Sequence, residues 1–257
     1  QVSSKILKHE NNFFFIVSVH DISKIKILDR LKTRFVSISA HQLRTPLSAL
    51  RWTFEYLLKR EKEKLGDKHY VLIEKALLSV NQMIGIVNHL LHVSRAEEGK
   101  ITLKLKEGDL SEVVFSVLSL LEEEIKRKKI KLSLKLPAHS LPKFKFDREY
   151  LTLALQNILD NAIRYNREKG EVELTLERID NKVKFKIKDT GIGIPQNEKD
   201  YIFSEFFRAS NAQKMIPSGS GIGLFLTKAI IEAHYGEIWF ESKENEGTTF
   251  YFTLPII

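Results

Sequence analysis

The feature that most constrains the fold is an apolar stripe that recurs every three or four residues between positions 73 and 91. This alternation lies close to the 3.5-residue period at which helices wrap around one another, so it predicts a long helix with a helical partner. The stripe consists of Ile73, Leu77, Val80, Ile84, Val87 and Leu91. An earlier stripe at helical spacing offers that partner, at Leu28, Leu31, Phe35, Ile38, Leu47, Leu50, Phe54 and Leu57.

Pro46 and Gly66 divide this helical region. Proline removes a backbone donor and clashes with the preceding turn, and the first stripe changes phase across it, so we expect a bend at residues 41–46. Gly66-Asp67 interrupts the pattern and predicts the turn of an antiparallel helical hairpin. Because a lone hairpin buries little surface, two hairpins are expected to form a homodimeric four-helix bundle.

From residue 101 the pattern changes to short strands that alternate with helices. Strands are expected at 101–105, 130–136, 172–178, 182–188 and 248–254, and helices at 110–127, 147–165 and 222–234. A mixed sheet with helices predicts an α/β sandwich. The expected fold class is therefore α+β multidomain, with a helical domain at 25–98, a sandwich domain at 99–257 and a flexible joint at residues 97–100.

The first 24 residues form a separate segment, in which β-branched and aromatic residues at 13–19 predict a strand. Asp21-Ile22-Ser23 then offers a helix N-cap. The chain begins with Gln1, so we expect it to be a piece of a longer protein. No apolar run approaches the ~20 residues of a membrane helix. We therefore expect a cytoplasmic location, with any membrane anchor of the parent protein upstream of Gln1.

Composition excludes some chemistry and favours an anionic partner. The chain has no cysteine, which excludes a disulfide scaffold, a thiolate metal site and a cysteine nucleophile. Its net charge of +8 favours a nucleotide, a nucleic acid or a lipid headgroup. Basic and acidic residues are interleaved, however, so the charge does not choose among these partners.

Two glycine-rich loops could form parts of a ligand site. Residues 189–194 (Asp-Thr-Gly-Ile-Gly-Ile) follow a predicted strand, and Asp189 could accept a hydrogen bond from an exocyclic amine. Residues 219–224 (Gly-Ser-Gly-Ile-Gly-Leu) open a predicted helix, whose free amides and dipole would make a phosphate cradle. The second loop fits neither a Rossmann fingerprint nor a Walker loop. The first loop is also compatible with a plain strand exit.

Asn157 and Asn161 lie four residues apart on the predicted helix 147–165, so their amides face the same way. Amide oxygens are hard, neutral ligands that suit Mg²⁺ already carrying phosphate oxygens. Tyr165 lies one turn further along, where its ring could stack on a base. A polar helix face in solvent is the alternative interpretation.

Two further motifs have both a functional and a plain interpretation. Phe203, Phe206 and Phe207 precede Arg208, which predicts either a hydrophobic anchor for a mobile loop or an arginine that reaches a γ-phosphate. His41 faces away from the apolar stripe, so its imidazole would be exposed and able to attack a phosphoryl group. The alternative for His41 is a solvated or hydrogen-bonded histidine without chemistry.

In their order along the chain, these motifs resemble those of the sensor histidine kinases of two-component systems. Residues 41–47, 157–161, 189–193, 203–208 and 219–223 match the H, N, G1, F and G2 boxes of that family. The resemblance covers residues 25–257. Residues 1–24 resemble the end of a PAS-type sensor domain.

The resemblance implies that Mg-ATP phosphorylates His41, which then passes the phosphoryl group to an aspartate in the receiver domain of a response regulator. It implies that Asp189 accepts a hydrogen bond from the adenine amino group and that Tyr165 stacks near the adenine ring. It also implies that Asn161 holds Mg²⁺, with Asn157 beside it. Thr45 matches the residue that orients water for dephosphorylation of the regulator. Arg164 and Arg208 would contact the phosphates, and residues 195–218 would form a lid over ATP. The two loops would bind the nucleotide through Gly191, Gly193, Gly219, Gly221, Gly223 and Leu224.

Gln42 departs from the family, which usually has Glu or Asp after the histidine. Its amide oxygen can accept from the ring N–H, but it cannot take a proton as a carboxylate would. We therefore expect autophosphorylation that is slower than in a Gln42→Glu variant, by up to about 10²–10⁴-fold.

Three alternatives remain at this point. The first is a dimeric scaffold that binds ATP without phosphorylating itself. The second is another ATPase of the same nucleotide-binding fold, of the chaperone, gyrase or mismatch-repair type, although those lack the helix pair of His41. The third is a nucleic-acid binder, which only the net charge supports, so no direct nucleic-acid partner is expected.

Overall fold

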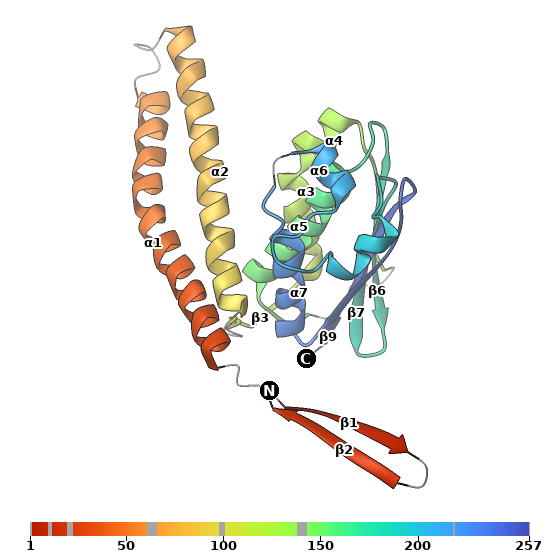
Figure 1. Cartoon of the computed structure of the whole chain (residues 1–257). Coiled ribbons are helices and arrows are strands. Elements are labelled where there is room, and N and C mark those ends of the chain that lie inside the picture. The colour runs from red at the N-terminus through yellow and green to blue at the C-terminus, as the bar shows by residue number, and fades with distance from the viewer. Residues whose placement is uncertain are drawn as a thin grey trace. The chain divides into compact units, whose positions relative to one another are not determined.

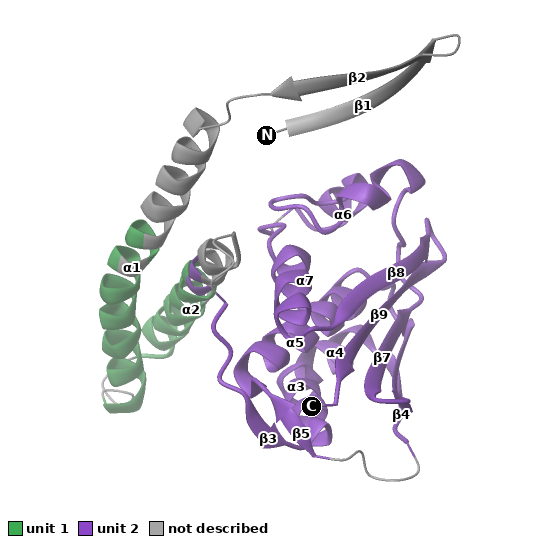
Figure 2. Cartoon of the chain, turned by 90° about the horizontal axis from the view of Figure 1, so that it is seen from below, with its two compact units in different colours: residues 1–87 green, residues 88–257 purple. Residues whose placement is uncertain are grey.

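The computed structural model describes residues 2–9, 12–19, 23–60, 66–97, 101–137, 143–217 and 219–256. Side chains are described from Ile38 onward, apart from those of His41 and several residues in the second long helix. The chain forms two compact units, residues 1–87 and residues 88–257 (Figure 2).

The first unit contains a β-hairpin and two long helices (Figure 1). Strand β1 (Val2–His9) pairs antiparallel with β2 (Asn12–Val19), which confirms the strand predicted at 13–19 and adds one that was not predicted. Helix α1 spans Ser23–Arg60 and α2 spans Asp67–Glu97. The two helices lie side by side and antiparallel, as the hairpin prediction requires (Figure 1). The predicted cap residues Asp21 and Ile22 lie outside the described residues.

Both predicted stripes contain buried residues. Leu47 of the first stripe is buried, together with Val80, Val87 and Leu91 of the second. Helix α1 is continuous through Pro46, and the bend expected there stays a prediction. Gly66 directly precedes α2 and its carbonyl accepts from the amides of His69 and Tyr70, which agrees with a turn at this point.

The second unit is built on a five-stranded mixed sheet in the order β4-β6-β7-β9-β8. Strands β4 and β6 are parallel, and every other neighbouring pair in this sheet is antiparallel. The strands are β4 (Lys131–Lys135), β6 (Glu171–Ile179), β7 (Lys182–Asp189), β8 (Glu237–Lys243) and β9 (Gly247–Pro255). Two short strands, β3 (Lys106–Gly108) and β5 (Phe144–Phe146), pair separately.

Helices cover one face of this sheet, which gives the predicted α/β sandwich (Figures 1 and 2). They are α3 (Leu110–Leu120), α4 (Glu122–Lys128), α5 (Arg148–Arg164) and α7 (Gly223–Ala233). Between β7 and α7 the chain adds a short 3₁₀ helix, η1 (Gln196–Tyr201), and helix α6 (Ser210–Met215). Alternate residues of β6 and β7 point inward and form the core with α5, and Phe185 stacks on Phe252 at 4.2 Å.

The structure corrects two predicted elements. Residues 101–105 are not a strand: Ile101 and Leu103 pack on the core, but the amide of Lys104 donates to the Asp147 carboxylate at 2.7 Å instead of to a strand. The helix predicted at 110–127 is two helices, because the chain leaves helical geometry at Leu121 (φ −99°, ψ 1°). Strands β3, β5 and β8 were not predicted.

Candidate functional site

A cavity of about 200 Å³ lies in the second unit, between α5, the turn after β7, the β7–α7 connection and the start of α7. It brings together most of the residues predicted for nucleotide binding. They are Asn157, Asn161, Arg164, Tyr165, Asp189, Gly193, Arg208, Gly219, Gly221, Gly223 and Leu224. The predicted Gly191 does not line the cavity but supports its edge.

Asp189, the last residue of β7, has one satisfied and one available carboxylate oxygen. Oδ1 accepts from the amides of Gly191 at 2.8 Å and Thr248 at 3.1 Å. Oδ2 makes no hydrogen bond to another residue that the structure describes, so it can accept from a ligand in the cavity. Burial raises the pKa of Asp189 to about 6, against the opposing effect of the two amide hydrogen bonds.

The glycines after Asp189 are required by contacts with the protein itself. A Cβ on Gly191 would lie 2.5 Å from the carbonyl oxygen of Tyr165, and one on Gly193 would lie 2.0 Å from that of Lys243. Gly193 also has a φ of +62°, which favours glycine. The turn is therefore held between the end of α5 and the end of β8.

The two predicted asparagines do lie on one helix, α5, and differ in their surroundings. Nδ2 of Asn157 donates to the carbonyl of Gly223 at 3.2 Å and to Oγ1 of Thr227 at 3.4 Å, which ties α5 to the start of α7. The Asn161 side chain makes no hydrogen bond to another described residue. Asn161 is thus the one with its amide available to a ligand.

Arg164 pairs with a residue that the sequence analysis missed. Its Nη1 lies 3.3 Å from Oδ2 of Asp160, which also lines the cavity. Burial raises the pKa of Asp160, and the charge of Arg164 opposes that shift. The i, i+4 spacing of an acid and an arginine on one helix was the available signal for this pair.

The loop before α7 has the features of an anion-binding helix start. Helix α7 begins at Gly223 without a side-chain cap hydrogen bond, so amides of its first turn lack a capping partner of that kind. Gly221 has a φ of +70°, and its Cβ would lie 2.6 Å from the carbonyl carbon of Phe206. The loop therefore packs directly on the aromatic motif.

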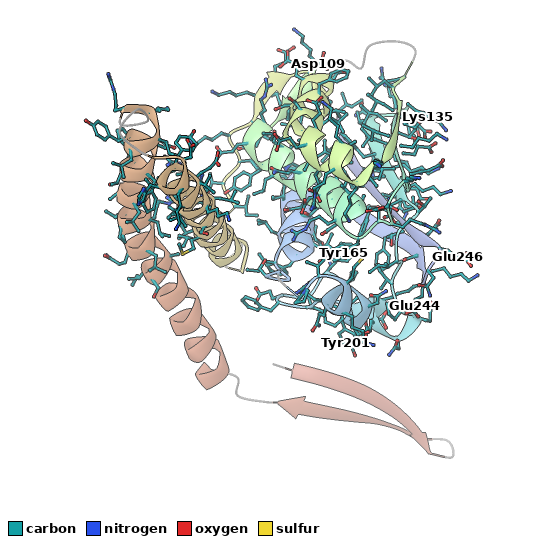
Figure 3. The ribbon with its side chains drawn as sticks, turned by 90° about the horizontal axis from the view of Figure 1, so that it is seen from above. Asp109, Lys135, Tyr165, Tyr201, Glu244 and Glu246 are labelled. Carbon is teal, nitrogen blue, oxygen red and sulfur yellow. The ribbon has the colours of Figure 1, made fainter. Side chains whose placement is uncertain are left out.

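Arg208 is engaged within the β7–α7 connection. Its guanidinium donates to the carbonyl oxygens of Ile216 and Pro217 just after α6, and Nη2 lies 3.5 Å from the hydroxyl of Tyr165. Tyr165, labelled in Figure 3, directly follows α5. Arg208 thus links this connection to α5.

The aromatic motif is split between core and surface. Phe203 packs edge-on against Phe240 at 5.7 Å, and Phe207 lies near Tyr201 at 5.8 Å. Phe206 is exposed and has a φ of +57°. The packing of Phe203 and Phe207 supports the interpretation of this motif as a hydrophobic anchor.

The predicted phospho-acceptor region lies in the first unit, within α1. Gln42 and Thr45 are exposed, as is Pro46. The backbone of His41 is helical, whereas its side chain lies outside the described residues.

Within the described part of the chain, no three residues of the His, Cys, Asp or Glu type are grouped so that they could hold a metal ion. Among the same residues, no helix has the length and apolar character needed to cross a membrane.

Comparison with known families agrees with this geometry. Residues 31–99 match the model of the His Kinase A (phospho-acceptor) domain, and residues 146–257 match that of the histidine kinase-, DNA gyrase B- and HSP90-like ATPase domain. The chain belongs to the sensor histidine kinase family, as the order of its motifs predicted.

Individual relatives are similar over most of this chain. The adaptive-response sensory kinase SasA from Synechococcus sp. (strain JA-3-3Ab) is 33% identical over 228 residues, which are 88% of this chain and 59% of SasA. The chain thus spans less than two thirds of the length of the curated relatives that it matches.

Two solved structures support the fold. Full-length ShkA in complex with AMPPNP superposes with a TM-score of 0.71 at 26% identity, over 86% of this chain and 45% of ShkA. The catalytic domain of the histidine kinase ThkA gives a TM-score of 0.53 at 32% identity, over 60% of this chain and 99% of that domain.

Proposed function

We propose that this protein is an ATP-dependent histidine kinase that phosphorylates His41 and passes the phosphoryl group to an aspartate in the receiver domain of a response regulator. The observation that supports this most is the cavity, which gathers residues of four separate predicted motifs around one space. The proposed domains are 25–98 for dimerisation and phosphotransfer and 99–257 for ATP binding, after a PAS-type end at 1–24. The proposed compartment is the cytoplasm, where ATP and receiver domains occur.

ATP fits the donors and acceptors that the cavity offers. Oδ2 of Asp189 can accept from the adenine amino group, and Tyr165 can pack near the ring. The uncapped start of α7 and the loop at 219–223 suit the phosphates. Arg164 and Arg208 would reach the phosphates by exchanging their present partners, Asp160 and the carbonyls after α6.

Mg²⁺ fits the site as an ion that arrives with the nucleotide. The described residues contain no ready-made group of three carboxylate or histidine ligands, but Asn161 has an available amide and Asp160 and Asn157 lie beside it. Bound there, the ion would neutralise phosphate charge.

In the proposed reaction, a ring nitrogen of His41 forms a bond to the γ-phosphorus of ATP while the bond from that phosphorus to the β,γ-bridging oxygen breaks. ADP leaves with the bonding electron pair. The exposed amide of Gln42 can accept from the other ring N–H and fix the tautomer. It cannot remove that proton, which passes to water from the phosphorylated ring. His41 then donates the phosphoryl group to the carboxylate of the regulator.

A homodimer is the proposed assembly. Leu43, Leu50 and Leu78 are 51%, 44% and 61% exposed in the single chain, although they lie on helices that already pair with each other. A second hairpin would cover such side chains and complete a four-helix bundle.

Labelling tests the kinase directly. The chain is incubated with γ-labelled ATP and Mg²⁺ beside a His41→Ala variant, and the product is treated with acid and alkali. Label that is acid-labile, alkali-stable and absent from the variant is expected. A chain that binds ATP but takes up no label would instead be a non-enzymatic scaffold, and ATP turnover independent of His41 would indicate another ATPase of this fold.

Thr45 is proposed to support dephosphorylation of the regulator, because it is exposed one helical turn after His41. Thr45→Ala should abolish phosphatase activity on the phosphorylated regulator while labelling of His41 continues. Loss of both activities would assign Thr45 a structural role instead.

A further inference from the structure

Asn211, in the first turn of α6, joins the β7–α7 connection to the turn that follows β7. Its Nδ2 donates to the carbonyl of Gly193 at 3.0 Å and reaches that of Ile192 at 3.4 Å. Its Oδ1 accepts from the amide of Ala212 at 2.8 Å. Asn211, Ala212 and both carbonyl residues line the cavity, so these bonds lie along its edge.

The turn that Asn211 binds is already fixed on its other sides. The amide of Ile192 donates to the carbonyl of Tyr165 at 3.0 Å, and the carbonyl of Ile192 accepts from the amide of Asn245 at 2.7 Å. Gly193 abuts the carbonyl of Lys243 so closely that no side chain fits. The turn is therefore a firm anchor, and α6 is the element that Asn211 attaches to it.

Other hydrogen bonds of α6 remain inside the connection. The amide of Ser210 donates to the carboxylate of Glu198 at 2.9 Å, and Nε2 of Gln213 donates to the carbonyl of Arg208 at 2.7 Å. These bonds shape the connection but do not attach it to the turn. The side chain of Asn211 makes that attachment, whereas the longer contact between Arg208 and Tyr165 joins the connection to the end of α5.

We propose that Asn211 is a positioning residue that latches α6 to the 191–193 turn and thereby slows the release of nucleotide from the cavity. The proposal rests on the proposed function, since it assumes that ATP occupies this cavity. Opening the connection requires breaking both hydrogen bonds of Nδ2. Because the side chain of Asn211 makes no hydrogen bond to the start of α7 in the described part of the second unit, its loss should act on nucleotide retention and leave the phosphoryl-transfer step unchanged.

An isosteric substitution distinguishes the role of the Asn211 donor, Nδ2, from that of its acceptor, Oδ1. Asn211→Asp keeps the oxygen that accepts from Ala212 but replaces the donor with a second oxygen facing two carbonyl oxygens. Asn211→Leu removes donor and acceptor without adding charge. Asn181→Asp makes the same chemical change at an exposed position in the β6–β7 turn, outside the cavity lining, and controls for the added charge.

The measurement is the dissociation rate of a fluorescent ATP analogue from the full chain with Mg²⁺, followed by stopped flow, together with KM and kcat for labelling of His41. Losing these hydrogen bonds should speed dissociation and raise KM by about 3- to 20-fold, most in Asn211→Asp. The kcat at saturating ATP should stay within about twofold, and Asn181→Asp should match wild type.

Wild-type dissociation rates in both Asn211 variants would overturn the proposal, as would a fall in kcat with unchanged affinity. Melting temperatures with and without nucleotide identify a variant that fails to fold; if Asn211→Asp does so, Asn211→Leu decides the outcome alone. Failure of the proposed function looks different, because the wild-type chain itself would then bind no ATP analogue.

Discussion

The two units of the molecule bury their apolar side chains to very different degrees. In the second unit, Leu151, Leu155, Ile158 and Leu159 of α5 are all fully buried against the sheet. In the first unit, Leu47 and Val80 are buried, but half or more of Leu43 and Leu78 is exposed. Both units have apolar stripes of similar regularity, so the difference lies in how many surfaces are available to cover them.

This difference distinguishes a self-sufficient fold, the sandwich, from the hairpin, for which a partner chain is proposed. The sandwich has two layers, and each covers the apolar face of the other. The hairpin can cover only the part of each helix that faces its neighbour, so the remaining apolar residues favour association with a second chain. The proposed phospho-acceptor therefore lies in the unit for which a dimer is proposed. The proposed nucleotide cavity lies in the unit whose core one chain completes.

The largest expected effect comes from opening the core of the second unit. Leu159→Ala removes a fully buried side chain and should lower the free energy of unfolding by about 2–5 kcal/mol. The two tryptophans make the measurement specific, because Trp52 lies in α1 and Trp239 in β8. In a Trp52→Phe background, denaturation followed by Trp239 fluorescence should shift to lower denaturant and be independent of protein concentration. A concentration-dependent midpoint would show that this unit also depends on a partner.

The next effect concerns the hairpin. Leu50→Asp places a charge in the stripe that a second chain is proposed to cover, so it should weaken the dimer by about 10²-fold or more. Sedimentation should show the shift to monomer, and unfolding reported by Trp239 in the same background should not change. The control is Lys75→Asp, an exposed polar position on α2. A wild-type chain that sediments as a monomer at micromolar concentration would contradict the proposed assembly.

The comparison also explains which parts of the fold could be read from the sequence. Long apolar stripes predicted α1 and α2, because the helical period persists over several turns. The pattern at 101–105 failed, since Lys104 is held by Asp147, a residue 43 positions away. Strand β8 was missed because the exposed Trp239 stands between Ile238 and Phe240 and hides the alternation.

The candidate site was predictable in its residue types and less so in its contacts. Asp189, Asn161 and the two glycine loops stood out as motifs, and the structure brings them to one cavity. The reason for Gly191 and Gly193, however, is the approach of Tyr165 and Lys243, which sequence order does not reveal. Asn211 carries no local signal either, because both its acceptors belong to a turn 18 or 19 residues earlier.

A smaller effect, on the binding of ATP, is expected from a substitution of Asp189 in the second unit. Asp189→Asn keeps the oxygen that accepts from Gly191 and Thr248 but turns the available acceptor into a donor. ATP affinity should fall by about 10- to 100-fold, the contribution of a hydrogen bond to a charged group. Calorimetry across pH sharpens the test: wild-type affinity should fall as pH drops through about 6, where Asp189 gains a proton, and the variant should lack this component.

The raised pKa of Asp189 also determines how the ionisation of this residue changes the stability of the fold with pH. The folded state holds the Asp189 proton more tightly than the unfolded state, so this group favours folding at low pH and loses that contribution as pH rises through about 6. Asp189→Asn should therefore be at least as stable as wild type at pH 7 while binding ATP poorly. A variant that is both unstable and unable to bind would make the residue structural.

The smallest expected effect concerns the C-terminal end of α5, which lines the cavity. Nζ of Lys128 donates to the carbonyl oxygens of Ile163, Arg164 and Asn166, which caps the C-terminus of the helix beside Tyr165. Burial lowers the pKa of Lys128, a cost that these hydrogen bonds must offset. Lys128→Met should lower the free energy of unfolding of the second unit by about 1 kcal/mol.

Lys126→Met is the matched control for Lys128, because Lys126 lies on the same short helix and its side chain is 73% exposed beside Glu122. It should leave the midpoint reported by Trp239 unchanged. If both variants shift it equally, the cap contributes no more than an exposed ion pair. A shift in Lys128→Met alone would show that the self-sufficient unit, despite its complete apolar core, still depends on one cation to hold the helix end that lines its cavity.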